Sequence, residues 1–81
     1  DMPGYLYSLK TSIRGKDFKS IEATAHAMKS MAAYVGSAEL TQVLQDIETL
    51  AGRNNSMQEI EEKYSKASSL VNLVLAEINH V

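Results

Sequence analysis

Apolar residues recur at three- and four-residue steps along nearly the whole chain, and this spacing constrains the fold more than any other feature. One face of an α-helix has the same repeat, so each run with this spacing predicts a helix that buries one side. One proline, at position 3, and four glycines, at positions 4, 15, 36 and 52, interrupt the runs. We therefore expect an all-α chain with four amphipathic helices.

Each expected helix has a residue that begins or ends it. The first helix is short, over about residues 4–14. Polar side chains that accept hydrogen bonds from a first turn are the expected N-caps, and glycines are expected after a last turn. The predicted N-caps are Asp17, Ser37 and Ser56, with Glu59 completing a capping box, and the predicted stops are Gly15, Gly36 and Gly52.

The spacing also predicts which residues are buried. The buried faces are Leu6, Leu9 and Ile13 in the first helix, Phe18, Ile21, Ala25, Met28, Ala32 and Val35 in the second, Leu40, Val43, Leu44, Ile47 and Ala51 in the third, and Ile60, Tyr64, Ala67, Val71, Val74 and Ile78 in the fourth. Short turns make consecutive helices neighbours, which favours an antiparallel up-down-up-down four-helix bundle. A first helix of ~15 Å leaves the end of the fourth uncovered, with Leu70 and Leu73 unpartnered.

Composition excludes several classes of protein. With 81 residues and 44% apolar side chains, residues 1–81 form one domain with one core. A net charge of −2 with scattered Lys and Arg argues against nucleic acid, and no apolar run approaches the roughly 18 residues of a membrane span. The absence of cysteine fits a reducing compartment, so we expect a cytoplasmic location. Because the chain begins with Asp1, we expect it to be a piece of a longer protein.

Motifs for self-contained catalysis are missing. The chain has no glycine-rich phosphate loop and no Gly-x-Ser-x-Gly elbow. Its two histidines, His26 and His80, are too far apart for the i, i+4 spacing of a helical metal pair, so no metal is expected. His80 lies near the end of the last helix, where an imidazole interacts favourably with exposed carbonyls.

His26 points about 140° away from the buried Ile21 and is therefore expected to face solvent. Lys29 follows one turn later, with Cβ atoms about 5 to 6 Å apart, where its charge would neutralise an anion on the ring. Glu22, one turn before, would favour the imidazolium or fix the tautomer by bonding the nitrogen that does not react. These are the requirements of a nucleophile for a phosphoryl group, although an exposed histidine near a lysine is also ordinary helix surface.

The run AHAMKSMAAYVGSAEL, residues 25–40, resembles the motif of histidine-containing phosphotransfer (HPt) domains. The matching positions are Ala25, His26, Lys29, Gly36 and Leu40, with Met28 in place of leucine and Ser30 in place of the usual glycine. The likeness extends from about Leu6 to Leu50 and includes the helix start at Asp17 and the Ile47-Glu48 pair.

The resemblance implies a role for each matching residue. His26 would carry the phosphoryl group, Lys29 would help to bind it, and Ser30 would be the small residue that lets a partner dock. A polar side chain from the next helix is implied near the phosphohistidine, and Gln45, Glu48 and, from its own helix, Glu22 are the candidates. The implied docking surface around His26 consists of small or apolar side chains, namely Ala23, Met31, Ala33 and Tyr34.

The implied function is that of a phosphorelay intermediate between receiver domains, which supply the aspartate and the Mg²⁺, so the chain itself needs no cofactor. We expect a module of a hybrid sensor histidine kinase, with its other domains in the same polypeptide, located in the cytoplasm or in the cytoplasmic part of a membrane-anchored kinase. We expect no contact with nucleic acid or membrane. Two alternatives remain: the phosphoacceptor domain of a chemotaxis-type histidine kinase, and a non-catalytic helical interaction module.

Overall fold

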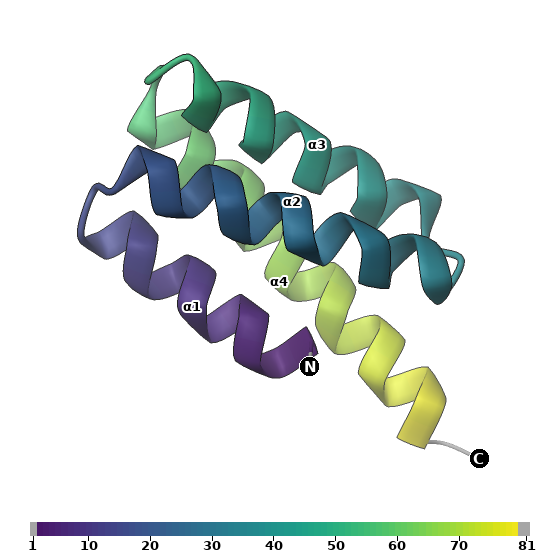
Figure 1. Cartoon of the computed structure of the whole chain (residues 1–81). Coiled ribbons are helices and arrows are strands. Elements are labelled where there is room, and N and C mark those ends of the chain that lie inside the picture. Colours follow the sequence, from purple (N-terminus) through teal and green to yellow (C-terminus); the bar gives the residue numbers. More distant parts are fainter. Residues whose placement is uncertain (1, 80–81) are drawn as a thin grey trace.

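The computed structural model describes the backbone of residues 2–79 and the side chains of residues 2–76. Over this range the chain forms four α-helices and no strand, which confirms the all-α prediction (Figure 1). The helices are α1 (Met2–Arg14), α2 (Phe18–Tyr34), α3 (Ala38–Gly52) and α4 (Met57–Asn79). The side chain of Ile78 and the whole of His80, for which the sequence also made predictions, lie outside the described residues.

Each helix packs against two others: α2 and α4 both contact α1 on one side and α3 on the other. The bundle measures 40 × 20 × 18 Å, and in Figure 1 the C-terminal part of α4 continues past the N-terminus of α1. α1 has 13 residues, against 23 in α4. It begins at Met2 and not at residue 4, where the sequence predicted its start. Pro3 is tolerated there because the first turn of a helix leaves its N–H groups unpaired.

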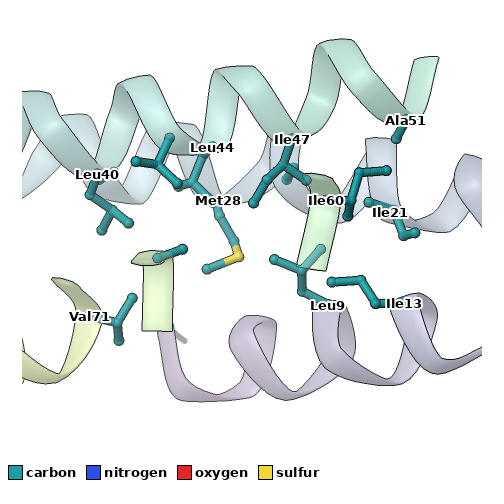
Figure 2. Close-up of a cluster of buried hydrophobic side chains, with 14 of the residues drawn as sticks. Leu9, Ile13, Ile21, Met28, Leu40, Leu44, Ile47, Ala51, Ile60 and Val71 are labelled. Carbon is teal, nitrogen blue, oxygen red and sulfur yellow. The ribbon is translucent and has the colours of Figure 1, made fainter. Parts of the chain in front are cut away.

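The core consists of the predicted faces of the four helices, with few differences (Figure 2). The fully buried larger side chains are Leu9, Ile21, Met28, Leu40, Leu44, Ile47, Ile60 and Val71. Burying each such side chain contributes roughly 1.5–3 kcal/mol, and together these contacts hold the helices in place.

Three apolar residues, Val35, Met2 and Leu70, differ from the prediction. Val35 is 41% exposed because it is the C-cap of α2 and no longer follows the helical repeat. Met2 is buried although the helix was expected to begin after it. Leu70 packs against the core at its edge, whereas Leu73 is 61% exposed and Leu75 is half-buried. Only Leu73 therefore matches the expectation of an unpartnered leucine on α4.

The predicted N-caps form. The side chains of Asp17, Ser37 and Ser56 accept hydrogen bonds of 3.2 Å from the backbone N–H groups of Ser20, Leu40 and Glu59. In the expected capping box, only this half is present, because the N–H of Ser56 donates to Asn55 Oδ1 at 2.8 Å and not to Glu59. These caps satisfy backbone donors that a helix cannot pair internally.

The first three helices end in the same way, with one residue in the left-handed conformation. The backbone N–H of this left-handed residue donates to the carbonyl of the residue three positions earlier. The backbone N–H of the following residue donates to the carbonyl five positions before itself. The left-handed residues are Lys16 (φ 54°), Gly36 (φ 78°) and Asn54 (φ 49°). The predicted stops at Gly15, Gly36 and Gly52 agree with the helix ends, but only Gly36 is itself left-handed, since Gly15 and Gly52 each precede the left-handed residue by one or two positions.

Lys16→Gly should stabilise the domain by about 0.5–1 kcal/mol. A side chain in the left-handed conformation costs about 1–2 kcal/mol, of which the greater flexibility of glycine in the unfolded chain cancels about 0.5–1 kcal/mol. The free energy of unfolding in urea measures this effect. Asn54 is the equivalent left-handed residue after α3. Asn54→Gly should raise the free energy of unfolding by less, because asparagine tolerates this conformation better than lysine does. An equal gain in both variants would contradict this account.

Candidate functional site

His26 stands on the outer face of α2, where the spacing predicted it. Its side chain is 69% exposed, whereas Ile21, Ala25 and Met28 are fully buried on the opposite face of the same helix. The helix is anchored at its start by the Asp17 cap, whose hydrogen bonds to the side chain and backbone of Ser20 lower the pKa of the Asp17 carboxyl. The ring is therefore presented to solvent by a helix that is well anchored at its N-terminus and along its buried face.

The ring is oriented by α3. Nδ1 of His26 lies 2.9 Å from Oε2 of Glu48. An ionised carboxylate has no hydrogen to give, so in this contact Nδ1 carries the hydrogen and donates it. In a neutral imidazole with Nδ1 protonated, the lone pair available for reaction is on Nε2. The contact thus selects one tautomer of His26.

Glu48 also holds Lys29. The Lys29 ammonium lies 2.6 Å from Oε1 of Glu48 and donates to Oε1 of Gln45 at 2.8 Å. Oε1 of Glu48 is buried and accepts no hydrogen bond of good geometry, so its contact with Lys29 is a close ion pair. Glu48 therefore bridges the imidazole and the ammonium with its two oxygens, and Gln45 supports the ammonium from the same helix.

The charge of Glu48 is stabilised by this arrangement. The contact with Lys29 has the largest effect and lowers the pKa of the Glu48 carboxyl below its ordinary value. Partial burial opposes this effect, and the contact with His26 adds to the lowering. Glu48 is consequently ionised at neutral pH, as its role as acceptor for both side chains requires.

Glu22 does not orient the ring, although its position one turn before His26 made it a candidate. Its carboxylate lies against the end of α3, so close to Gly52 that a Cβ at position 52 would be 2.6 Å from Oε2 of Glu22. Glu22 makes no hydrogen bond to His26 among the described contacts. The acidic side chain that contacts the ring is that of Glu48, 22 residues further along the chain.

Thr49 belongs to the same network and was missed by the sequence reasoning. Nε2 of Gln45 donates to Oγ1 of Thr49 at 3.0 Å, which turns Oε1 of Gln45 toward Lys29. The signal available in the sequence was the i, i+4 spacing of these two residues on one helix, a common pairing that does not by itself indicate a site.

The expected docking residues lie on the outside of α2. Ala23, Ser30 and Ala33 are exposed, and Tyr34 is 93% exposed, while Met31 is half-buried. Beyond Ser30 an apolar groove of about 340 Å³ lies between the C-terminal parts of α2 and α4. It is lined by Met2, Ser30, Met31, Tyr34, Val35, Val74 and Leu75.

A second, shallower groove of about 450 Å³ follows the seam between α2 and α3. Its lining is small or polar and reaches Gln45 at one end: Ala33, Gly36, Ser37, Ala38, Thr41, Gln42 and Gln45. The surface around the His26 site is therefore of low relief and accessible to a large partner.

Among the described residues no cluster of three or more His, Cys, Asp or Glu side chains is arranged to hold a metal ion. None of the described helices is both long and apolar enough to cross a membrane.

The comparisons with known proteins gave one match, to a family model. The family model of the Hpt domain matches residues 1–80. Neither a curated protein nor a solved structure gives a significant match to the chain. The match to the family model covers all four helices.

Lys29→Met should destabilise the domain by about 0.5–1 kcal/mol at pH 7 and by less at pH 3. A carboxyl whose pKa is lowered by folding adds stability above its pKa in the unfolded chain and loses it as the pH falls through the folded value. Glu48 should therefore lose its contribution as the pH falls below about 4, where carboxyls begin to protonate. Urea unfolding at both pH values, with NMR titration of Glu48, measures the effect.

Lys63→Met is the matched control for this prediction. Lys63 pairs with Asp46 at 3.3 Å across α3 and α4, but both side chains are more exposed than Lys29 and Glu48. Loss of this exposed ion pair should change the free energy of unfolding very little. If Lys29→Met costs the same at pH 7 and pH 3, the aliphatic stem of Lys29 stabilises the domain and its charge does not.

Proposed function

The chain belongs to the Hpt domain family, and from this premise we propose that it is a phosphorelay intermediate in which His26 carries the phosphoryl group. Membership of the family implies histidine phosphotransfer in phosphorelays. His26 would accept the group from an aspartyl phosphate of one receiver domain and pass it to the aspartate of another. The observation that carries this assignment is the contact of Nδ1 with Glu48, which leaves Nε2 as the exposed nucleophile.

The neighbour relations of the helices support the expected bundle topology. Consecutive helices pack together, and α1 and α4 close the ring. We infer from these pairs the antiparallel up-down-up-down order, with a first helix shorter than the rest. In this order the outer face of α2 and the adjoining seam with α3 are free for a partner.

The reaction needs little chemistry from the chain itself. Nε2 of His26 attacks phosphorus in line while the bond between phosphorus and the aspartate oxygen breaks, and the electron pair of that bond remains on the aspartate. The hydrogen on Nδ1 stays in place, so the ring gains positive charge as the new bond forms. Glu48 stabilises this charge through Nδ1–H, and the reverse steps return the group to a second aspartate.

Lys29 is placed to stabilise the phosphoryl group. An ammonium has three N–H donors; that of Lys29 donates to Gln45 and forms an ion pair with Glu48. This leaves an N–H for a phosphoryl oxygen on the neighbouring imidazole, one turn before Lys29. Thr49 would act through Gln45 by keeping its carbonyl toward Lys29.

The partner domain would approach over the outer face of α2. Ala23, Ser30 and Ala33 present little bulk around the ring, which allows the aspartyl phosphate to reach Nε2 in line. Positioning matters because a displacement on the order of 1 Å can cost ~10²-fold in rate. Met31 and Tyr34, at the apolar groove, would supply hydrophobic contact area. The receiver would bring the Mg²⁺, and other domains of a hybrid sensor kinase would be linked to this one.

The direct test is transfer from a receiver domain loaded with acetyl phosphate and Mg²⁺. The protein should gain one acid-labile, base-stable phosphate, and His26→Gln should gain none. The free energy of unfolding of His26→Gln should stay within about 0.5 kcal/mol of the parent because an exposed side chain is changed. Mass analysis of peptides locates the phosphate.

Two outcomes of this experiment would count against the proposal. Label on His80 in the His26→Gln variant would show that the accessible histidine has been misassigned. Phosphorylation by an ATP-loaded kinase domain, with none from any phosphorylated receiver, would favour the phosphoacceptor domain of a chemotaxis-type kinase.

Glu48→Gln should slow the transfer on the order of 10²-fold. Removing one group that stabilises developing charge has an effect of this size in enzymes. The amide can donate to Nδ1, which would move the ring hydrogen to Nε2 and remove the nucleophile. The ¹⁵N shifts of the ring should therefore report Nδ1–H in the parent and Nε2–H in the variant.

Asp46→Asn is the control, since it removes one charge from the same helix at a residue that pairs with Lys63 and not with His26. It should transfer at the parental rate. A Glu48→Gln variant that keeps both the parental tautomer and the parental rate would show that Glu48 does not orient His26.

A further inference from the structure

The charged residues are divided unevenly between the two halves of the chain. Residues 1–35 contain five Lys or Arg and three Asp or Glu, whereas residues 36–81 contain three and seven. Four of the five cations of the first half gather around the turn between α1 and α2, and we call them the basic turn: Lys10, Arg14, Lys16 and Lys19. All four are exposed, and none forms an ion pair with another described residue.

The two acidic residues of this region are already engaged. Asp17 caps α2 through Ser20, and Glu22 lies against Gly52 at the end of α3. Asp17 still attracts Lys19, but the four cations of the basic turn outnumber these two carboxylates and leave an excess of positive charge at this corner of a molecule whose net charge is −2.

The basic turn lies close to His26. Lys19 precedes it by seven residues, which is two helical turns on the same face of α2 and about 10 Å along the axis. Arg14 and Lys10 lie on α1, which packs beside α2 and joins it at the basic turn (Figure 1). This separation of Lys19 from His26 is well within the Debye length of about 30 Å at 0.01 M salt, so the field of Lys19 reaches the ring at low ionic strength and is screened as the salt concentration rises.

We propose that the basic turn steers a partner with an acidic face to His26. The inference rests on the proposed function, because the partner it names is the receiver domain that brings the aspartyl phosphate. The aspartyl phosphate that such a partner presents is an anion at the point of contact. Opposite charges on two surfaces raise the rate of encounter and orient the partners before contact.

The experiment measures the second-order rate of phosphotransfer at low and high salt from a receiver domain of net negative charge, loaded with acetyl phosphate. Lys19→Glu should lower this rate by roughly three- to tenfold at low salt, and the difference should vanish near 0.5 M salt because screening removes steering. The rate at saturating receiver should not change, since Lys19 is distant from the reacting atoms.

Lys66→Glu is the matched control. Lys66 is also an exposed helical lysine without an ion pair among the described residues, but it lies on α4. Both variants change the net charge equally, so the control should stay within about twofold of the parent if the local field matters. Lys19→Glu should fold, because an acidic residue is favourable in the first turn of a helix, and circular dichroism checks this.

The outcomes separate the two proposals. If the parent protein accepts no phosphate from receivers at any salt concentration, the proposed function fails. If transfer occurs but Lys19→Glu and Lys66→Glu slow it equally, only net charge matters and the steering role is overturned. The steering role is also overturned if Lys19→Glu loses binding to anionic vesicles or duplex DNA while its transfer rate stays parental. The basic turn would then bind a different polyanion.

Discussion

The packing of α2 against α3 sets the distance between His26 and Glu48, on which the chemistry of the site depends. Fully buried side chains on both helices, among them Met28, Leu44 and Ile47, fix how the two helices are turned toward each other. Small buried residues such as Ala25 and Ala32 leave room for close approach. The two polar residues that meet at the seam are thereby held 2.9 Å apart without any covalent link or metal.

One carboxylate serves three purposes in this arrangement. It selects the tautomer of the histidine and holds the ammonium of Lys29 beside the ring, and in the proposed transfer it would stabilise positive charge on the imidazole. The lowered pKa of Glu48 follows mainly from the same contact with Lys29 and keeps the carboxylate charged. In the proposed function such a site needs little else from the chain, because the receiver would provide the phosphoryl group, the aspartate and the metal ion.

The outer face of α2 joins the site to the surfaces around it. The basic turn lies at its N-terminal end, His26 near its middle, and the apolar groove beside Ser30 and Tyr34 at its C-terminal end. A partner interface of standard size, about 800 Å² on each side, covers such a face from end to end. If both proposals hold, electrostatic attraction, phosphotransfer and apolar contact would follow one another along α2, and a small domain could in this way orient a larger partner.

The sequence by itself determined the four helices, their N-caps at Asp17, Ser37 and Ser56, most of the buried faces and the exposure of His26. These features follow from the helical repeat and from side chains that act on their own backbone, so neighbouring residues are enough to predict them. The tertiary structure decided which acidic residue orients His26, because rotation of α3 about its axis, set by packing, brings Glu48 to the ring while Glu22 turns to Gly52. It also decided that Lys16 and Asn54, which lie one and two residues after a glycine, take the left-handed positions that follow α1 and α3, because the backbone hydrogen bonds that close these helices are made there.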